Sequence, residues 1–215
     1  MSGQSIRSAA DVEPGIRVEQ PALVVVDMQN DFVRAGAPLE VPDARATIPV
    51  QQRLIAEFRR RGHPVIFTQF LSRQAENLLW LWSPQCRPDI RCCWKGFQRA
   101  YDDAPGTRDC TEIIDELRPE PGDLRIEKYG YCAFHGTALD GHLRTLDIKS
   151  LVVTGTVTQI CVDETARAGF HHGYRTTLVE DAVSSFAPDL HVATLKNFAI
   201  KFGWVAPAET VISWL

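Results

Sequence analysis

The feature that most constrains the fold is an alternation of short apolar runs with longer stretches of helical periodicity. Strands are expected at residues 22–27, 65–68, 124–127, 151–154 and 175–179. Helices are expected at residues 48–61, 110–117, 137–146, 158–172 and 190–200. Strands that alternate with helices of this length imply βαβ units, so the sequence predicts an α/β fold with a mainly parallel central sheet.

Length and composition favour one globular domain. The 215 residues are 45% hydrophobic and 23% charged, which allows a sizeable core. We expect residues 1–19 to be an N-terminal extension and residues 20–215 to be a single domain. The net charge of −4 favours neither nucleic acid nor an anionic membrane as a partner. No apolar run approaches a membrane span, and the polar N-terminus lacks the apolar core of a signal peptide, so a cytoplasmic protein is expected.

Three chemically useful side chains follow predicted strands. Asp27 closes the first strand, Lys128 follows the strand at 124–127, and Cys161 comes after the strand at 151–154 and a glycine-containing turn. Ligands of parallel α/β sheets bind at the carboxyl ends of the strands, so these groups can converge there. A thiol at a helix N-terminus feels the positive end of the helix dipole, which predicts a lowered pKa for Cys161.

Each of these residues also has a structural interpretation. Asp27 can cap a turn or a helix, and Lys128 can be a solvated charge at a strand end. Cys161 can be a small apolar filler of the core.

Four stretches carry a family resemblance: VVDMQNDF at 25–32, KYGYCAFHGT at 128–137, TGTVTQICV at 154–162, and residues 173–182. In this order they resemble the isochorismatase-like cysteine hydrolases, the superfamily of nicotinamidase, N-carbamoylsarcosine amidohydrolase, ureidoacrylate hydrolase and biuret hydrolase. The resemblance covers roughly residues 20–205 and implies the isochorismatase-like hydrolase fold, a three-layer αβα sandwich. The segment from about 71 to 106 fits poorly, and substrate-specific sequence is expected there.

The resemblance implies a catalytic role for each matching residue. Cys161 would be the nucleophile, Asp27 the general base that takes the thiol proton, and Lys128 the group that stabilises both charges. The backbone N–H groups of Val157 and Cys161 would form the oxyanion hole, with a cis peptide between Thr156 and Val157. Acyl transfer requires such a nucleophile, a proton shuttle and aimed N–H donors.

Cysteines and histidines address the question of a metal. The cysteines are Cys86, Cys92, Cys93, Cys110, Cys132 and Cys161. No C-x-x-C pair occurs, so free thiols are expected, with a zinc site built from Cys86, Cys92 and Cys93 as the alternative. Some nicotinamidases carry an Asp-x-His motif after the second strand, and residues 68–73 of this sequence do not contain it. We therefore expect no catalytic metal and no cofactor, which argues against nicotinamidase.

Substrate contacts are expected mainly from aromatic residues. The candidates are Phe32, Trp80, Trp82 and Tyr131, together with the polar Gln69 and Gln159; Trp94, Phe97, Tyr101 and Arg73 are further candidates. Aromatic side chains also pack in cores and at subunit interfaces, so each has that alternative.

The sequence thus predicts a cysteine-dependent amidohydrolase that cleaves a C–N bond of a small amide or ureido or carbamoyl compound. A thioester-type acyl-enzyme would release ammonia or an amine, and ureidoacrylate or carbamoyl-type substrates come first. The alternatives are a nicotinamidase-like aryl amide hydrolase, a catalytically silent family member used for binding or assembly, and a redox-active thiol protein. The resemblance also implies a homodimer or homotetramer.

Overall fold

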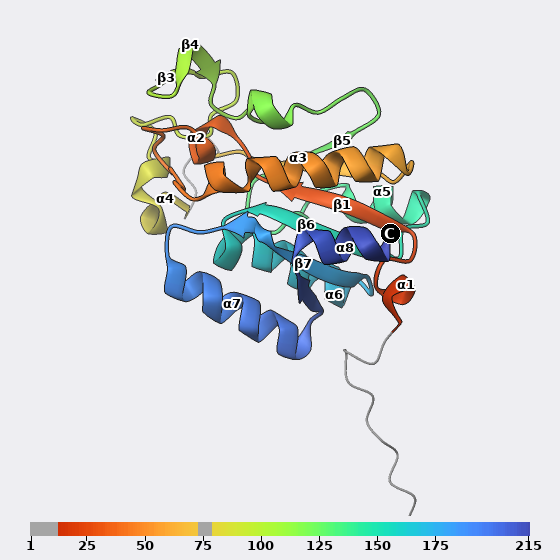
Figure 1. Ribbon diagram of the computed structural model, residues 1–215. Coiled ribbons are helices and arrows are strands. Elements are labelled where there is room, and N and C mark those ends of the chain that lie inside the picture. Colours follow the sequence, from red (N-terminus) through yellow and green to blue (C-terminus); the bar gives the residue numbers. More distant parts are fainter. Residues whose placement is uncertain (1–12, 73–78) are drawn as a thin grey trace, which may run out of the picture.

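The computed structural model describes residues 13–72 and 79–215, and its centre is one parallel sheet (Figure 1). The strand order is β5-β2-β1-β6-β7-β8, and every neighbouring pair is parallel. The strands are β1 Pro21–Val26, β2 Val65–Phe70, β5 Leu124–Lys128, β6 Ser150–Thr156, β7 Arg175–Ser184 and β8 Trp204–Ala206. The predicted α/β fold with a mainly parallel sheet is therefore confirmed.

Helices cover both faces of the sheet and bury its apolar strands. Helices α3 (Ala44–Arg60) and α8 (Ala208–Trp214) pack on one face, where Leu23 and Val25 of β1 point. Helices α5 (Leu139–Thr145), α6 (Asp163–His171) and α7 (Pro188–Lys201) cover the other face, with Ala22 and Val24 beneath them (Figure 1). A strand buried on both faces needs apolar residues at every position, which explains the uninterrupted runs in the sequence.

Segments outside the sheet carry elements that the sequence did not predict. They are the short helices α1 Pro14–Arg17, α2 Asn30–Val33 and α4 Leu79–Trp82, the 3-10 turn η2 Pro84–Cys86, and the hairpin of β3 Gln98–Tyr101 and β4 Ala104–Asp109. β8 and α8 were also not predicted. All of these are short, so their periodicity is too brief to read from sequence.

The prediction of a helix at residues 110–117 is wrong. This segment is a turn that ends in the 3-10 turn η3 Asp115–Leu117. Its backbone pairs with the loop after β1: Ile113 forms a bridge with Gln29, and the Ile114 N–H donates to the Met28 carbonyl at 2.9 Å. These tertiary hydrogen bonds replace the helical ones that the apolar spacing suggested.

Residues 13–19, in the expected N-terminal extension, pack against the domain. The Arg17 guanidinium lies 4.8 Å from the centre of the Trp214 ring and 5.7 Å from that of Trp204. The Ser150 hydroxyl donates to the Glu19 carbonyl at 2.8 Å. None of the helices within the described residues combines the length and apolar character that a membrane span requires.

Candidate active site

Asp27 lies immediately after β1, at the carboxyl end of the sheet, and is fully buried. Its φ of 49° lies in the left-handed region, which aspartate tolerates better than most residues. Thr68 of the neighbouring β2 donates its hydroxyl to Asp27 Oδ1 at 2.6 Å and accepts the Asp27 backbone N–H at 3.2 Å. The two bonds fix both the backbone and the carboxylate of Asp27.

Lys128 ends β5, and its side chain reaches past β2 to the same carboxylate. Lys128 Nζ donates to Asp27 Oδ2 at 2.7 Å and to the Gly130 carbonyl at 3.1 Å, and it lies 5.3 Å from the centre of the Phe70 ring. Burial lowers the pKa of Lys128, but the attraction of Asp27 and Cys161 outweighs it and the pKa is raised. The lysine is therefore a buried ammonium ion with a carboxylate partner.

A close approach between two strands brings Cys161 to this pair. Gly155 of β6 pairs with Val26 of β1 and has a φ of 106°, and a Cβ on it would lie 2.1 Å from the Val26 carbonyl oxygen. Only glycine fits there. The chain then passes through a cis peptide between Thr156 and Val157, as the resemblance implied, into the π-helical turn η4 Thr158–Val162. Cys161 lies in that turn, directly before α6.

Cys161 is 3% exposed, and its thiol lies close enough to Asp27 and Lys128 to interact with both charges. Burial raises the pKa of this thiol, and the Asp27 charge adds to the rise, while Lys128 opposes it. The lowered pKa predicted from the helix N-terminus is therefore wrong. A helix dipole contributes only about 1 kcal/mol, which is less than the cost of burying a thiolate. The resting thiol holds its proton at neutral pH.

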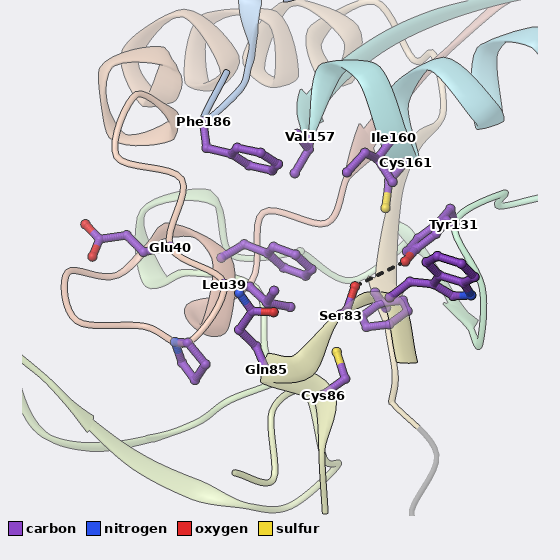
Figure 2. Close-up of a pocket in the computed structure, with 14 residues that line it drawn as sticks. Leu39, Glu40, Ser83, Gln85, Cys86, Tyr131, Val157, Ile160, Cys161 and Phe186 are labelled. Atoms are coloured by element: carbon purple, nitrogen blue, oxygen red, sulfur yellow. Dashed lines mark hydrogen bonds between the residues drawn. The ribbon is translucent and has the colours of Figure 1, made fainter. Parts of the chain in front are cut away.

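A cavity of about 380 Å³ opens beside Cys161. Figure 2 shows the Cys161 sulfur pointing into it from one side, with Ser83, Gln85 and Cys86 on the other. Its apolar lining consists of Phe32, Pro38, Leu39, Phe70, Trp82, Val157, Ile160 and Phe186. Polar groups come from Glu40, Ser83, Gln85 and Tyr131, and the Ser83 and Tyr131 hydroxyls are 3.4 Å apart.

The comparisons with known proteins identify the family to which this site belongs. The Isochorismatase domain model matches residues 21–210. The chain belongs to the isochorismatase family. Ureidoacrylate amidohydrolase RutB of Pantoea ananatis (strain LMG 20103) is 34% identical over 89% of this chain and 80% of its own length. The homologue of Rhizobium rhizogenes (strain K84 / ATCC BAA-868) is 32% identical over 94% of this chain and 87% of its own length.

Solved structures agree with this family. N-carbamoylsarcosine amidase from Thermoplasma acidophilum is 33% identical, with a TM-score of 0.72 over 88% of this chain and 96% of its own. A cysteine hydrolase from Pseudomonas syringae pv. phaseolicola 1448A is 26% identical, with a TM-score of 0.78 over 100% and 98% of the two chains. The comparisons confirm the expected superfamily, its fold and its enzyme class, because the named relatives include amidohydrolases, which cleave C–N bonds.

The residues expected to contact substrate in this isochorismatase-family chain divide into two groups. Phe32 and Tyr131 line the cavity, and so does Trp82, which is 84% exposed at its edge. The Trp80 side chain and Arg73 lie outside the described residues.

Gln69 and Gln159 are absent from the described lining of this cavity, so their contact with substrate stays a prediction. The Gln69 side chain donates to the Thr111 carbonyl at 2.8 Å and so holds the turn after β4. Gln159 accepts the Ser185 hydroxyl at 2.7 Å. Both amides are used in tertiary contacts that a sequence does not show. Trp94, Phe97 and Tyr101 are also absent from the described lining.

Several lining and positioning residues were missed at the sequence level. Thr68, which fixes Asp27, carried a usable signal because it lies on a strand next to β1 near the same sheet edge. Phe70 on the same strand had a similar signal. Ser83, Gln85 and Phe186 carried none, because they lie in connections whose course depends on tertiary packing.

One group of side chains among the described residues fits a metal ion. It consists of Asp31, Cys92 and Cys93, all of which are buried. It neighbours Cys86, which contacts Cys92 and also lines the cavity.

Proposed function

We propose that this chain is a cysteine-dependent amidohydrolase that cleaves a small ureido or carbamoyl compound through a thioester-type acyl-enzyme. The observation that carries the proposal is the buried Asp27–Lys128 ion pair beside Cys161 at the edge of the cavity. A nucleophile, a proton acceptor and a fixed cation in contact are the groups that acyl transfer needs.

The first half of the cycle forms the acyl-enzyme. The Cys161 thiol transfers its proton to the Asp27 carboxylate as the sulfur attacks the substrate carbonyl carbon. The developing oxyanion is stabilised by the backbone N–H groups of Val157 and Cys161, both of which line the cavity. Asp27 then gives its proton to the leaving nitrogen, the C–N bond breaks, and ammonia or an amine departs. Lys128 stays charged and stabilises the negative charge as it moves between oxygen and sulfur.

The second half regenerates the thiol. A water molecule attacks the thioester carbon while Asp27 accepts one of its protons. The C–S bond breaks, the acid product leaves, and Asp27 returns the proton to the Cys161 sulfur. Because the resting thiol is protonated, nucleophile activation is coupled to attack on the bound substrate and needs no standing thiolate.

The cavity supports a small and largely apolar substrate with one polar group. The apolar walls include Phe32, Leu39 and Phe186, whereas Gln85 and the Ser83 and Tyr131 hydroxyls offer hydrogen bonds for a ureido or carbamoyl group. The names of the ureidoacrylate and N-carbamoylsarcosine relatives favour the same substrate class. The aromatic walls favour an aryl amide as the second candidate, because aromatic rings contact one another well.

The test is ammonia release from a panel of ureido, carbamoyl, aryl amide and alkyl amide compounds. We expect release with at least one ureido or carbamoyl compound, and its loss by about 10⁴-fold or more in Cys161→Ala. Cys132→Ser is the matched control, because this half-buried thiol is absent from the described lining. A covalent mass increase on Cys161 during turnover identifies the acyl-enzyme.

Two results would contradict the proposal. Full ammonia release by Cys161→Ala excludes the thiol as nucleophile. A folded parent chain that releases no ammonia across the panel and carries no adduct on Cys161 supports a catalytically silent family member. Release from aryl amides alone assigns the second candidate.

A further inference from the structure

A second group of thiols lies outside the catalytic machinery. Cys86, Cys92, Cys93 and Cys110 are each no more than 4% exposed, and the Asp31 carboxylate is fully buried among them. One Asp31 oxygen and the sulfur atoms of Cys92 and Cys93 all lie within 4.8 Å of one another. Isolated buried cysteines are usually inert packing residues, but convergence on a carboxylate makes a ligand set.

The backbone turns two successive cysteines toward the same carboxylate. Neighbouring side chains on an extended strand point to opposite faces. Here Arg91 and Cys93, on either side of Cys92, have φ values of 53° and 51°, in the left-handed region. The Cys93 N–H donates to Asp31 Oδ2 at 2.8 Å, which fixes the loop on the carboxylate.

The sulfur spacing matches tetrahedral coordination. The sulfur atoms of Cys92 and Cys93 are 3.7 Å apart. Two thiolates on a tetrahedral zinc ion, with Zn–S bonds of about 2.3 Å, lie about 3.8 Å apart. Cys86 lies outside this 4.8 Å group, but its thiol interacts with Cys92 and with Asp31, so a small side-chain movement would bring it in as a fourth ligand.

The carboxylate is held in the way that metal ligands commonly are. Asp31 Oδ1 accepts Arg99 Nε at 2.9 Å and the Tyr101 hydroxyl at 2.7 Å. Such outer contacts orient a ligand and leave lone pairs for the ion. The Arg99 charge also offsets part of the negative charge that thiolates and a carboxylate would gather there.

We propose that Asp31, Cys86, Cys92 and Cys93 form a structural site for a thiophilic divalent cation of the zinc type. Each coordinating thiol gives its proton to solvent as the ion binds, and no redox step is involved. Cys110 stays outside the ligand set, because its thiol already donates to the Trp94 carbonyl at 3.2 Å. The site takes no part in C–N cleavage.

The ion would join three segments, two of which contribute residues to the lining of the cavity. Asp31 belongs to α2, next to Phe32, while Cys86 belongs to η2 and itself lines the cavity. Cys92 and Cys93 lie in the loop that precedes the β3–β4 hairpin. Because a thiol must lose its proton to coordinate the ion, metal binding competes with protons and strengthens as the pH rises.

The test is Co²⁺ titration of the reduced, metal-free full chain in the Cys161→Ala background, with Zn²⁺ as competitor. We expect one Co²⁺ per chain, with the visible bands of tetrahedral Co²⁺ and thiolate-to-metal absorption, both removed by stoichiometric Zn²⁺. Affinity should fall by about 100-fold or more in Cys92→Ser and Cys93→Ser. Cys110→Ser is the matched buried control and should keep the parent affinity.

A measurement on the unsubstituted chain covers the case in which a variant does not fold. Zn²⁺ should protect Cys86, Cys92 and Cys93 from alkylation, as read by peptide mass spectrometry, whereas Cys132 keeps its reactivity. The proposal is overturned if all six thiols titrate in the denatured chain and the native chain takes up no Co²⁺. It is also overturned if Co²⁺ binds equally well to the parent chain and to folded Cys92→Ser and Cys93→Ser.

Discussion

The two walls of the cavity are built in opposite ways. The catalytic wall presents Cys161, and the Asp27–Lys128 pair lies buried next to this thiol at the strand ends. All three residues are at most 3% exposed. The opposite wall comes from α4 and η2, where Trp82 is 84% exposed and Ser83 contacts Tyr131 at 3.4 Å. The sheet thus fixes the reacting groups, while an irregular connection shapes the surface that meets the rest of the substrate. This division lets substrate preference change without disturbing the chemistry.

The largest effect is expected from Lys128→Met, which alters the catalytic wall. We expect kcat to fall by about 10³-fold or more, because the cation that stabilises sulfur and oxygen charge is removed. The Asp27 carboxylate would also be left buried without its counter-ion, which costs on the order of 3–5 kcal/mol of unfolding free energy. Steady-state kinetics and urea denaturation measure the two effects. Lys95→Met, on an exposed ion pair with Glu127, should leave kcat unchanged, and an equal loss in both variants would contradict the assignment.

Thr68→Val tests whether the positioning of Asp27 matters separately from its charge. Valine keeps the side-chain shape but removes the donor to Asp27 Oδ1 and the acceptor of the Asp27 N–H. We expect kcat to fall about 10- to 100-fold with little change in KM, since the carboxylate is present but poorly aimed. Thr177→Val is the matched control, because this buried hydroxyl has no hydrogen-bond partner within residues 13–72 and 79–215. Unchanged kcat in Thr68→Val would show that the sheet alone aims Asp27.

The protonated Cys161 thiol predicts a pH effect on stability. The folded chain holds this proton above the pH at which an unfolded cysteine, with a pKa of about 8.5, releases it. The unfolded state then binds fewer protons, so the unfolding free energy falls as pH rises above about 9. We expect the unfolding free energy, measured by urea denaturation between about pH 9 and 10.5, to fall less steeply with pH in Cys161→Ala than in the parent chain. The difference in steepness should be up to about 1.4 kcal/mol per pH unit. Equal slopes would mean that the thiol is not held neutral by burial.

The smallest effect is expected on the opposite wall. Gln85→Leu removes an exposed polar group of the lining. We expect KM for the best substrate to rise about 3- to 10-fold with kcat nearly constant, because one solvent-accessible hydrogen bond is lost. Gln52→Leu on α3, whose amide donates to the Glu116 carbonyl, is the control. A large fall in kcat for Gln85→Leu would break the separation between the two walls.

The sequence was informative where the chain is regular. Residues 22–26 and 151–153 are apolar because both faces of the sheet are covered, and that pattern located the strand ends near which Asp27 and Cys161 lie. The mutual contact of Asp27 and Lys128 followed from the topology of parallel sheets. These features depend on local periodicity and on a general rule of architecture.

The sequence failed where distant hydrogen bonds decide the structure. Asp31 accepts the N–H of Cys93, 62 residues away, and Gln69 donates to the Thr111 carbonyl, 42 residues away. No periodicity encodes such pairs. The protonation state of Cys161 was missed for a related reason, since the helix position is visible in sequence whereas the depth of burial is not.

The Asp27–Lys128 ion pair joins residues 101 positions apart, and Thr68, which holds the same carboxylate, is 41 positions from Asp27. Pairing at such separations closes long loops and is slow to form during folding. A chain in which only strands and helices adjacent in sequence have assembled would lack the buried Asp27–Lys128 pair. Such a chain would be inactive even if Cys161 were correctly placed. Recovery of activity after dilution from denaturant therefore reports the pairing of β5 with β2 and of β2 with β1 in every molecule that turns over. The time course of that recovery measures when this part of the sheet is complete.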